Sequence, residues 1–296
     1  MTVPPPAEIR RIVYMGTPEV AVPPLVALHG AGFDLGLVIT RPERRRSRGG
    51  APRPSPVGEA AGELGLRIST DLDDVAGVAA DLVVVVAFGR IIPATLLDRV
   101  AMVNMHFSLL PRWRGAAPVE RAILAGDTRT GVCLMEVVEE LDAGGVYRRA
   151  VVPISPEDTL STLRRRLVAV GTEQLLGALD EGLGAPVPQT GAPVYAHKIR
   201  PEELRLDWSR PAGELHRLVR LGGAWTTLGG RRLKIHEARV VDDAGVGPGS
   251  IVGTIVGAGD GRGLELCLVQ PEGRARVDAA SWRNGARLGP DDRLGE

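Results

Sequence analysis

The stretch DLVVVVAFG, residues 81–89, narrows the possible folds of this chain more than any other. A strand exposed on one face alternates apolar and polar residues, whereas this stretch places β-branched valines at consecutive positions. Such a run is typical of a strand that is buried on both faces inside a parallel sheet. We therefore look for further strands, with helices between them.

Short apolar segments alternate with helix-like segments through residues 10–183. Residues 55–67 indicate a helix, because Ser55 is a good N-cap and Pro56 suits the first helical position. This alternation favours an open, mostly parallel, Rossmann-like α/β sheet. The strands are expected at residues 10–16, 34–40, 81–89, 101–107, 131–138 and 146–154, and the helices at 21–32, 55–67, 118–126 and 159–182.

The composition changes near residue 184. Residues 184–203 are rich in Pro and Gly without periodicity, which predicts an interdomain linker. A short helix at 211–221 follows, and then four segments separated by glycine turns (224–241, 249–259, 264–273 and 274–282) read as strands of a smaller, OB-like β-barrel. The expected organisation is a catalytic domain at 1–183, the linker at 184–203 and the barrel at 204–296.

Positive charge is concentrated in one segment. The formal net charge of the chain is zero, which excludes a whole-chain electrostatic argument for nucleic-acid binding. Residues 41–54, RPERRRSRGGAPRP, nevertheless contain six arginines and one glutamate. Such a density of like charge is tolerated most easily beside a polyanion. The segment favours phosphate binding over a merely solvated loop, without separating nucleic acid from a small phosphorylated ligand.

The sequence gives no indication of a disulfide-rich, zinc-binding, secreted, membrane-spanning or dinucleotide-binding protein. Cys133 and Cys267 lie far apart without metal-ligand spacing, so neither a disulfide framework nor a zinc site is expected. The first residues lack a signal-peptide pattern, and no apolar run reaches transmembrane length. We therefore expect a cytoplasmic protein. The turn MGTPEV, residues 15–20, lacks a GxGxxG pattern and predicts a pocket wall instead of a dinucleotide site.

The segment VNMHFSLLPRWRGAAP, residues 103–118, raises the question of chemistry. Asn104, His106 and Ser108 occupy alternate positions, so on a strand they share one face. An amide donates to a developing oxyanion, and imidazole transfers protons near neutral pH. Asp142, in ELDAGG, follows another strand at a Gly-rich turn from which its carboxylate can reach the same pocket. Spacing alone leaves catalytic and structural roles open for all of these residues.

These segments resemble the methionyl-tRNA formyltransferases, which belong to the folate-dependent formyltransferase superfamily. The resemblance covers nearly the whole chain, including MGTPEVAVPPLVAL, VVVVAFGRIIP, NMHFSLLPRWRGAAPVERAILAGDTRTGV, ELDAGGVY and AHKIRPEELRLDWSRPAGELHRLVR. It implies transfer of a formyl group from 10-formyltetrahydrofolate to the α-amino group of methionyl-initiator tRNA. It also implies that no metal is required, that the C-terminal barrel binds tRNA and that the protein is a monomer.

The resemblance assigns roles to individual residues. Asn104 and protonated His106 are implied to stabilise the oxyanion, and Asp142 to orient His106 and help remove the amine proton. Residues implied to contact folate are Phe88, Gly89, Arg90, Ile91, Ile92, Pro93, Val138, Glu139, Glu140 and Leu141. Residues implied to border the aminoacyl end are Gly16, Thr17, Pro18, Ser108, Leu109, Leu110, Pro111, Arg114 and Gly115. Residues implied to bind the acceptor stem are Arg41, Arg44, Arg45, Arg46 and Arg48.

Three other functions fit parts of the same pattern. A sugar-nucleotide N-formyltransferase or a formyltetrahydrofolate hydrolase would share the fold and the trio, but the arginine segment and the C-terminal domain argue against both. A non-catalytic nucleic-acid-binding protein is disfavoured by the complete trio. The chain departs from the resemblance at RLGGAWTTL, where a loop before Ala224 is shortened. Trp113 and Arg114 are compatible either with a pocket wall or with contact to the tRNA end.

Overall fold

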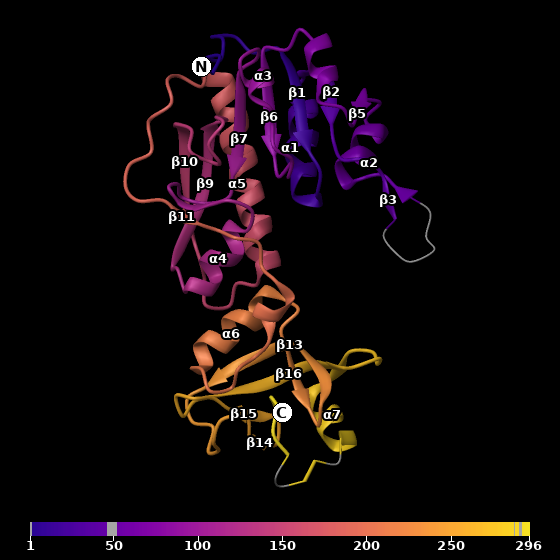
Figure 1. The fold of residues 1–296 in the computed structure, drawn as a ribbon, viewed down its shortest axis with the longest axis vertical. Coiled ribbons are helices and arrows are strands. Elements are labelled where there is room, and N and C mark those ends of the chain that lie inside the picture. The colour runs from indigo at the N-terminus through magenta and orange to yellow at the C-terminus, as the bar shows by residue number, and fades with distance from the viewer. Residues whose placement is uncertain (1, 46–51, 287, 290–291) are drawn as a thin grey trace. The chain divides into compact units, whose positions relative to one another are not determined.

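The computed structural model describes residues 2–45, 52–286, 288–289 and 292–296 (Figure 1). The chain forms two compact units. Unit 1 comprises Met1–Val119, Arg129–Pro153 and Leu163–His197, and unit 2 comprises Glu120–Thr128, Ile154–Thr162 and Lys198–Glu296. The division of the chain at residues 183 and 204 stays a prediction.

A seven-stranded sheet in the order β10-β9-β7-β6-β1-β2-β5 forms the centre of unit 1. The pairings from β7 across to β5 are parallel, and β9 and β10 extend the sheet with antiparallel pairings. The predicted open, mostly parallel sheet is therefore confirmed. Its strands are β1 (Arg11–Gly16), β2 (Asp34–Ile39), β5 (Ile68–Ser69), β6 (Leu82–Val86), β7 (Met102–His106), β9 (Arg129–Glu136) and β10 (Val146–Pro153).

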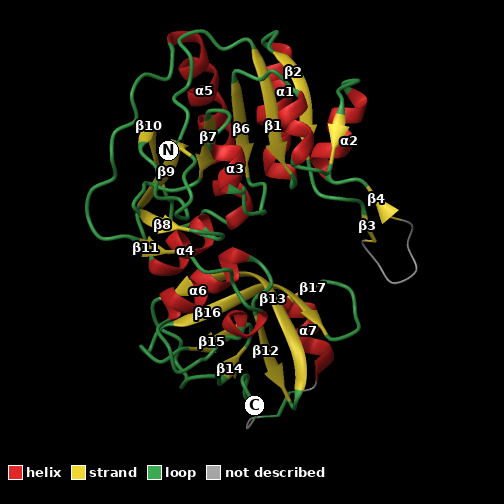
Figure 2. Cartoon of the chain, turned by 45° about the horizontal axis from the view of Figure 1, so that its top comes forward, coloured by secondary structure: helices red, strands yellow, loops and turns green. Residues whose placement is uncertain are grey.

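Helices cover both faces of this sheet, so β6 is buried at every position, as its valine run predicts (Figure 2). On one face, a Cβ added to Gly171 of α5 would lie 2.7 Å from the sulfur of Met105, so α5 packs directly on β7. On the other face, Leu96 and Leu97 of α3 pack with Val85. The helices are α1 (Val22–Gly30), α2 (Pro56–Glu63), α3 (Ala94–Leu97), α4 (Pro118–Ala125) and α5 (Leu160–Glu181).

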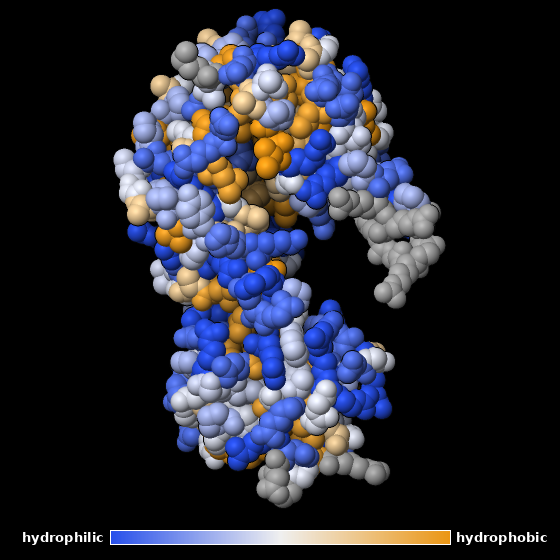
Figure 3. Space-filling model, viewed as in Figure 1, coloured by the Kyte–Doolittle hydropathy of each residue, from blue (hydrophilic) through white to orange (hydrophobic). Residues whose placement is uncertain are grey.

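The order of the strands reverses beside β1. The chain runs from β1 outward to β2 and β5, and then returns to the other side of β1 as β6. Ligands of such sheets bind at the carboxyl ends of the strands next to this reversal. Here Gly16 ends β1 opposite Val86, which ends β6, and β7 ends beside them at His106. Figure 3 shows a hollow bordered by hydrophobic residues on this part of unit 1.

An antiparallel sheet in the order β12-β13-β16-β15-β14 forms unit 2, with β17 paired to β16. Leu294 bridges Leu228 of β12, and Arg293 bridges Ser250 beside β14, so the C-terminal residues connect the two edges. This closure matches the predicted barrel-like domain. The elements are α6 (Ala212–Leu221), β12 (Trp225–Leu228), β13 (Arg231–Val241), β14 (Ile251–Val252), β15 (Ile255–Gly257), β16 (Gly263–Pro271), β17 (Val277–Asp278) and α7 (Ala279–Ala286).

The prediction of a strand at residues 274–282 is wrong for most of that segment. Only Val277 and Asp278 pair with β16, and α7 begins at the next residue. Asp278 causes the change, because its carboxylate accepts the backbone N–H of Ser281 at 2.9 Å and so caps a helix. Among the described residues, none of the helices is long and apolar enough to cross a membrane.

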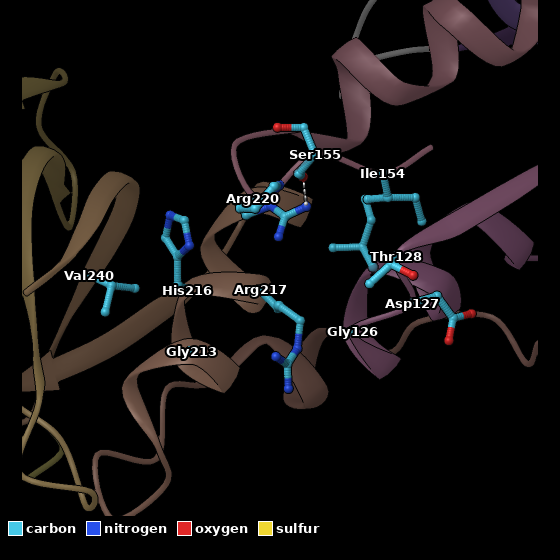
Figure 4. A pocket seen from close by; sticks show the side chains of 12 residues that line it. Gly126, Asp127, Thr128, Ile154, Ser155, Gly213, His216, Arg217, Arg220 and Val240 are labelled. Carbon is cyan, nitrogen blue, oxygen red and sulfur yellow. Dashed lines mark hydrogen bonds between the residues drawn. The ribbon is translucent and has the colours of Figure 1, made fainter. Parts of the chain in front are cut away.

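Two short segments that flank β9 and β10 in the chain belong to unit 2 because α6 binds their carbonyl groups. Arg217 Nε donates to the carbonyl of Leu124 at 3.0 Å, and Arg220 donates to the carbonyls of Asp158 at 2.6 Å and Ser155 at 3.0 Å. These contacts surround a cavity of about 270 Å³ (Figure 4). Burial of the neighbouring His216 and the charge of Arg220 lower the pKa of that imidazole. Both guanidinium groups are hydrogen-bonded to backbone carbonyls. The cavity therefore lies where α6 binds the two short segments, and its lining residues have a structural role within unit 2.

Candidate active site

Strand β7 carries the first two members of the predicted trio at the carboxyl edge of the sheet. Asn104 and His106 share the face that also bears Met102, opposite the face on which α5 packs. His106 is 6% exposed, whereas Asn104 is only partly buried. The amide of Asn104 forms no hydrogen bond with any residue that the structure describes, so its donors and acceptor are available to a bound molecule.

The ring of His106 is fixed from both sides. Its Nε2 lies 2.9 Å from the carbonyl oxygen of Trp113, and its Nδ1 lies 3.6 Å from Oδ2 of Asp142. A carbonyl oxygen accepts only, so Nε2 is the nitrogen that carries hydrogen in the neutral ring. The basic nitrogen is therefore Nδ1, beside the carboxylate.

The loop after β7 is folded so that a backbone carbonyl meets His106. The Ser108 hydroxyl donates to the carbonyl of Arg112 at 2.6 Å, the Leu110–Pro111 peptide bond is cis, and Trp113 has a φ of 66°. The Arg112 guanidinium lies 4.4 Å from the centre of the Trp113 ring. Ser108 is fully buried, so in this structure its side chain shapes the loop, and its contact with the aminoacyl end stays a prediction.

Asp142 lies in the loop between β9 and β10, as its Gly-rich sequence predicts. Its Oδ2 accepts the backbone N–H of Gly115 at 2.7 Å, and its own φ is 49°, in the left-handed region. Gly115 has a φ of 114°, which only glycine adopts easily. The carboxylate thus connects the loop after β7 to the loop after β9 and brings the predicted trio together.

The buried Arg114 and the partly buried Gln189 form a hydrogen-bonded network behind Asp142. Arg114 is 7% exposed and pairs with the carboxylate of Glu140 at 2.9 Å. Its Nε and Nη2 also donate to Oε1 of Gln189, at 3.1 and 2.9 Å. This geometry gives Arg114 a scaffold role within the pocket wall. Gln189 was missed by sequence reasoning because it lies in the segment expected to be only a linker.

The residues predicted to contact folate lie on two loops next to the trio. Phe88 is buried in the core against β6, whereas Ile91 is 92% exposed, and Leu141 on the other loop is 60% exposed. Arg90 donates to the carbonyl of Thr70 at 2.7 Å, which holds the first loop in place. Exposed apolar side chains of this size suit the ring of a flat ligand. Gly89, Ile92, Pro93, Val138, Glu139 and Glu140 complete these two loops.

The loop after β1 joins the loop after β6. Gly16 is buried, and the hydroxyl of Thr17 donates to the carbonyl of Phe88 at 3.2 Å, with the exposed Pro18 following. Leu109, Leu110 and Pro111 belong to the loop after β7, where Leu110 is buried with Met135 of β9. The structure therefore gathers the predicted substrate-binding residues at the same edge of the sheet.

The arginine segment is described only in part. Arg41 donates to the carbonyl of Gly89, so its guanidinium contacts the predicted folate loop. Arg44 and Arg45 form β3 (Arg44–Arg45), which pairs with β4 (Pro52–Arg53) as a hairpin. Arg46 and Arg48 lie outside the described residues. The assignment of these residues to tRNA binding stays a prediction.

Comparison with known proteins places this geometry in a family. A formyl transferase model matches residues 10–179, and a formyl transferase C-terminal domain model matches residues 198–287. The methionyl-tRNA formyltransferase of Jannaschia sp. (strain CCS1) is 43% identical over 298 residues, covering 95% of this chain and 98% of that protein. This chain belongs to the methionyl-tRNA formyltransferase family. The chain is therefore a formyltransferase. The family membership predicted from the sequence is confirmed.

Solved structures share the formyltransferase fold at low sequence identity. An N-formyltransferase from Helicobacter canadensis, in complex with folinic acid and dTDP-3-aminofucose, has a TM-score of 0.69 and 17% identity, covering 89% of this chain and 99% of that one. HypX from Aquifex aeolicus, in complex with tetrahydrofolic acid, has a TM-score of 0.66 and 18% identity. That match covers 93% of this chain but 47% of HypX, so the present chain spans about half its length.

Proposed function

We propose that this protein transfers the formyl group of 10-formyltetrahydrofolate to the free α-amino group of methionyl-initiator tRNA, giving N-formylmethionyl-tRNA for translation initiation. The convergence of Asn104, His106 and Asp142 at the carboxyl edge of the sheet carries the proposal. The methionyl-tRNA formyltransferases that align over nearly the whole chain support the choice of acceptor.

Asn104 supplies the hydrogen-bond donor for the chemical step. When the uncharged amine adds to the formyl carbon, negative charge develops on the formyl oxygen, and the unpartnered side-chain amide of Asn104 stabilises it. A donor of this kind contributes about 3–4 kcal/mol to lowering the barrier. Folate would supply the formyl group. The exposed side chains of Ile91 and Leu141 provide apolar surface for the folate ring.

His106 and Asp142 handle the proton. The N–C bond forms first, and the amine then loses a proton. When the tetrahedral intermediate collapses, the C–N bond to folate breaks and the folate nitrogen gains a proton. Nδ1 of His106, beside the Asp142 carboxylate, takes up the amine proton and returns it to the folate nitrogen as the C–N bond to folate breaks. The Trp113 carbonyl keeps the other ring nitrogen protonated and prevents the ring from turning.

Arginines at the edge of the sheet are the proposed contact for the tRNA acceptor stem. Arg41, Arg44 and Arg45 follow β2 and lie in the chain next to Arg46 and Arg48. Guanidinium groups bind phosphate bidentately, and such contacts make binding strongly dependent on salt. The alternative acceptors do not require such a series of cations: a sugar nucleotide carries few phosphates, and water carries none.

One assay separates the possible acceptors. The purified protein is incubated with 10-formyltetrahydrofolate and, in parallel, with methionyl-initiator tRNA, with an amino-sugar nucleotide and with buffer alone. We expect formylation of the tRNA at a rate far above release of formate. Formylation of the sugar alone, or formate release that does not depend on an acceptor, contradicts the proposal.

A further inference from the structure

Gln189 uses every hydrogen-bonding group of its side chain to join two parts of the active site. Its Oε1 accepts both Arg114 hydrogen bonds, and its Nε2 donates to the backbone carbonyls of Asp142 and Gly144, each at 2.8 Å. The orientation of the amide follows from this chemistry. A flipped amide would face the guanidinium donors with N–H groups and the two carbonyls with an oxygen.

The backbone around Gln189 is attached to the same loop. Val187 exchanges two backbone hydrogen bonds with Val146, at 2.8 and 2.9 Å, and Pro186 lies against Gly145. Further along, β11 (Val194–Tyr195) pairs with β8 (Arg112–Arg114). Residues 186–196, which we call the strap, therefore contact both loops that hold His106 and Asp142.

Asp142 depends on such support because its backbone is strained. Its φ of 49° lies in the left-handed region, which a residue with a side chain occupies at an energetic cost and only where its surroundings hold it there. The hydrogen bond from Gln189 to the carbonyl of Asp142 acts on this same residue. We propose that Gln189 is a positioning residue that keeps the Asp142 carboxylate against Nδ1 of His106. The catalytic part of this inference rests on the proposed function.

Two substitutions separate the contributions of the two halves of the amide. Gln189→Glu retains an acceptor for Arg114 but places a carboxylate oxygen against the carbonyls of Asp142 and Gly144. Gln189→Ala removes both halves. Gln174→Ala, on the partly buried side of α5, is the matched control, because Gln174 makes no hydrogen bond through its side chain with the described residues. We expect both Gln189 variants to loosen the loop, and Gln174→Ala to leave it unchanged.

The first measurement is amide hydrogen exchange of the loop at residues 140–146, which does not depend on the identity of the acceptor. We expect at least about tenfold faster exchange there in both Gln189 variants than in wild type and in Gln174→Ala, because local opening sets the exchange rate. Wild-type exchange at residues 140–146 in Gln189→Glu overturns the inference. This result is interpretable even if the proposed function fails.

The second measurement is a double-mutant cycle on kcat. Misplacement of a reacting group by about 1 Å costs up to a hundredfold, so Gln189→Ala is expected to lower kcat by at least about tenfold, with KM for the acceptor changed by less than about threefold. In an Asp142→Ala background the same substitution is expected to change kcat by less than about twofold, because its target is gone. An equal loss of kcat in both backgrounds overturns the positioning role and assigns Gln189 a general structural one.

Discussion

His106 and Asp142 face each other at 3.6 Å, with Nδ1 of the imidazole opposite the carboxylate oxygen that accepts the N–H of Gly115 at 2.7 Å. One oxygen therefore faces the imidazole of His106 and accepts a backbone N–H at once. Because the Gly115 backbone continues from Trp113, whose carbonyl binds Nε2, a single turn of chain fixes both the ring and its counter-charge. A substitution at Asp142 can therefore remove the negative charge while keeping the hydrogen bond from Gly115.

Asp142→Asn tests the charge. The amide oxygen still accepts the Gly115 N–H, so the loop keeps its shape, but the carboxylate charge beside Nδ1 of His106 is removed. We expect kcat to fall by about a hundredfold or more, with a small change in the midpoint of thermal unfolding. Steady-state formylation and calorimetry check this prediction. An Asn variant with wild-type kcat would remove Asp142 from the mechanism.

Asn104→Ala tests the oxyanion donor. The amide has no hydrogen-bond partner among the described residues, so its loss is expected to leave the free energy of unfolding within about 0.5 kcal/mol of wild type. The value of kcat is expected to fall by at least about a hundredfold. Asn284→Ala, on the exposed side of α7, is the control for both measurements. A parallel fall in stability and activity would indicate a structural role for Asn104.

Ser108→Ala tests whether the buried hydroxyl supports the loop. The substitution leaves the carbonyl of Arg112 without its 2.6 Å donor in a partly buried setting, and a hydrogen bond of this kind contributes about 0.5–1.5 kcal/mol. Urea unfolding measures this difference, with the exposed Ser161→Ala on α5 as the control. If stability is unchanged and KM for methionyl-tRNA rises alone, Ser108 is a substrate contact, as the family resemblance implies.

The double substitution of Arg44 and Arg45 by Ala tests the arginine segment. Each phosphate contact that is lost reduces the slope of log K against log salt by about 0.7–0.9, so we expect weaker tRNA binding and a slope smaller by about 1.4–1.8. Filter binding or fluorescence titration between 50 and 200 mM salt, roughly the range over which such contacts dominate, measures it. The exposed pair Arg67 and Arg165, changed together, removes the same charge elsewhere. Identical slopes in the two double variants would make this segment a solvated loop.

Glu203 is expected to contribute to stability in a way that depends on pH. Hydrogen bonding from Arg121 at 2.8 Å lowers the pKa of Glu203 from 4.5 to about 2. A lowered folded-state pKa means that the contribution is complete above about pH 4.5 and disappears as the pH falls toward 2. The stability difference between wild type and Glu203→Gln should therefore shrink across this window in denaturant titrations. Glu202→Gln, at the exposed neighbouring position, should show a constant difference.

The sequence predicted the sheet well because its signals are local. The valine run of β6, the Ser55 cap of α2 and the alternation of Asn104 and His106 each depend on neighbouring residues alone. The strand expected at 274–282 failed for an equally local reason, since Asp278 caps a helix that the apolar pattern did not reveal.

The supporting residues of the site could not be predicted in the same way. The Trp113 carbonyl acts through the backbone, which has no residue-specific signature. Gln189 reaches Asp142 across 47 positions of sequence, in a segment without periodicity. Such contacts depend on how the loops cross, and only the folded chain brings them together. The sequence predicts the reacting groups, and the structure shows which residues hold those groups in place.

The strap determines where a junction between the two domains can be placed in a chimeric protein. A chimera that takes its catalytic domain from this chain and its barrel from a relative would be joined most simply at residue 183, where the composition shifts. With that junction, the residues around Gln189 and the strand β11 would come from the relative, although they contact the active-site loops of this chain. A junction after His197 keeps the strap with the loops that it binds. In this protein, exchange of the barrel is therefore expected to preserve the active site only when the strap stays with the catalytic domain.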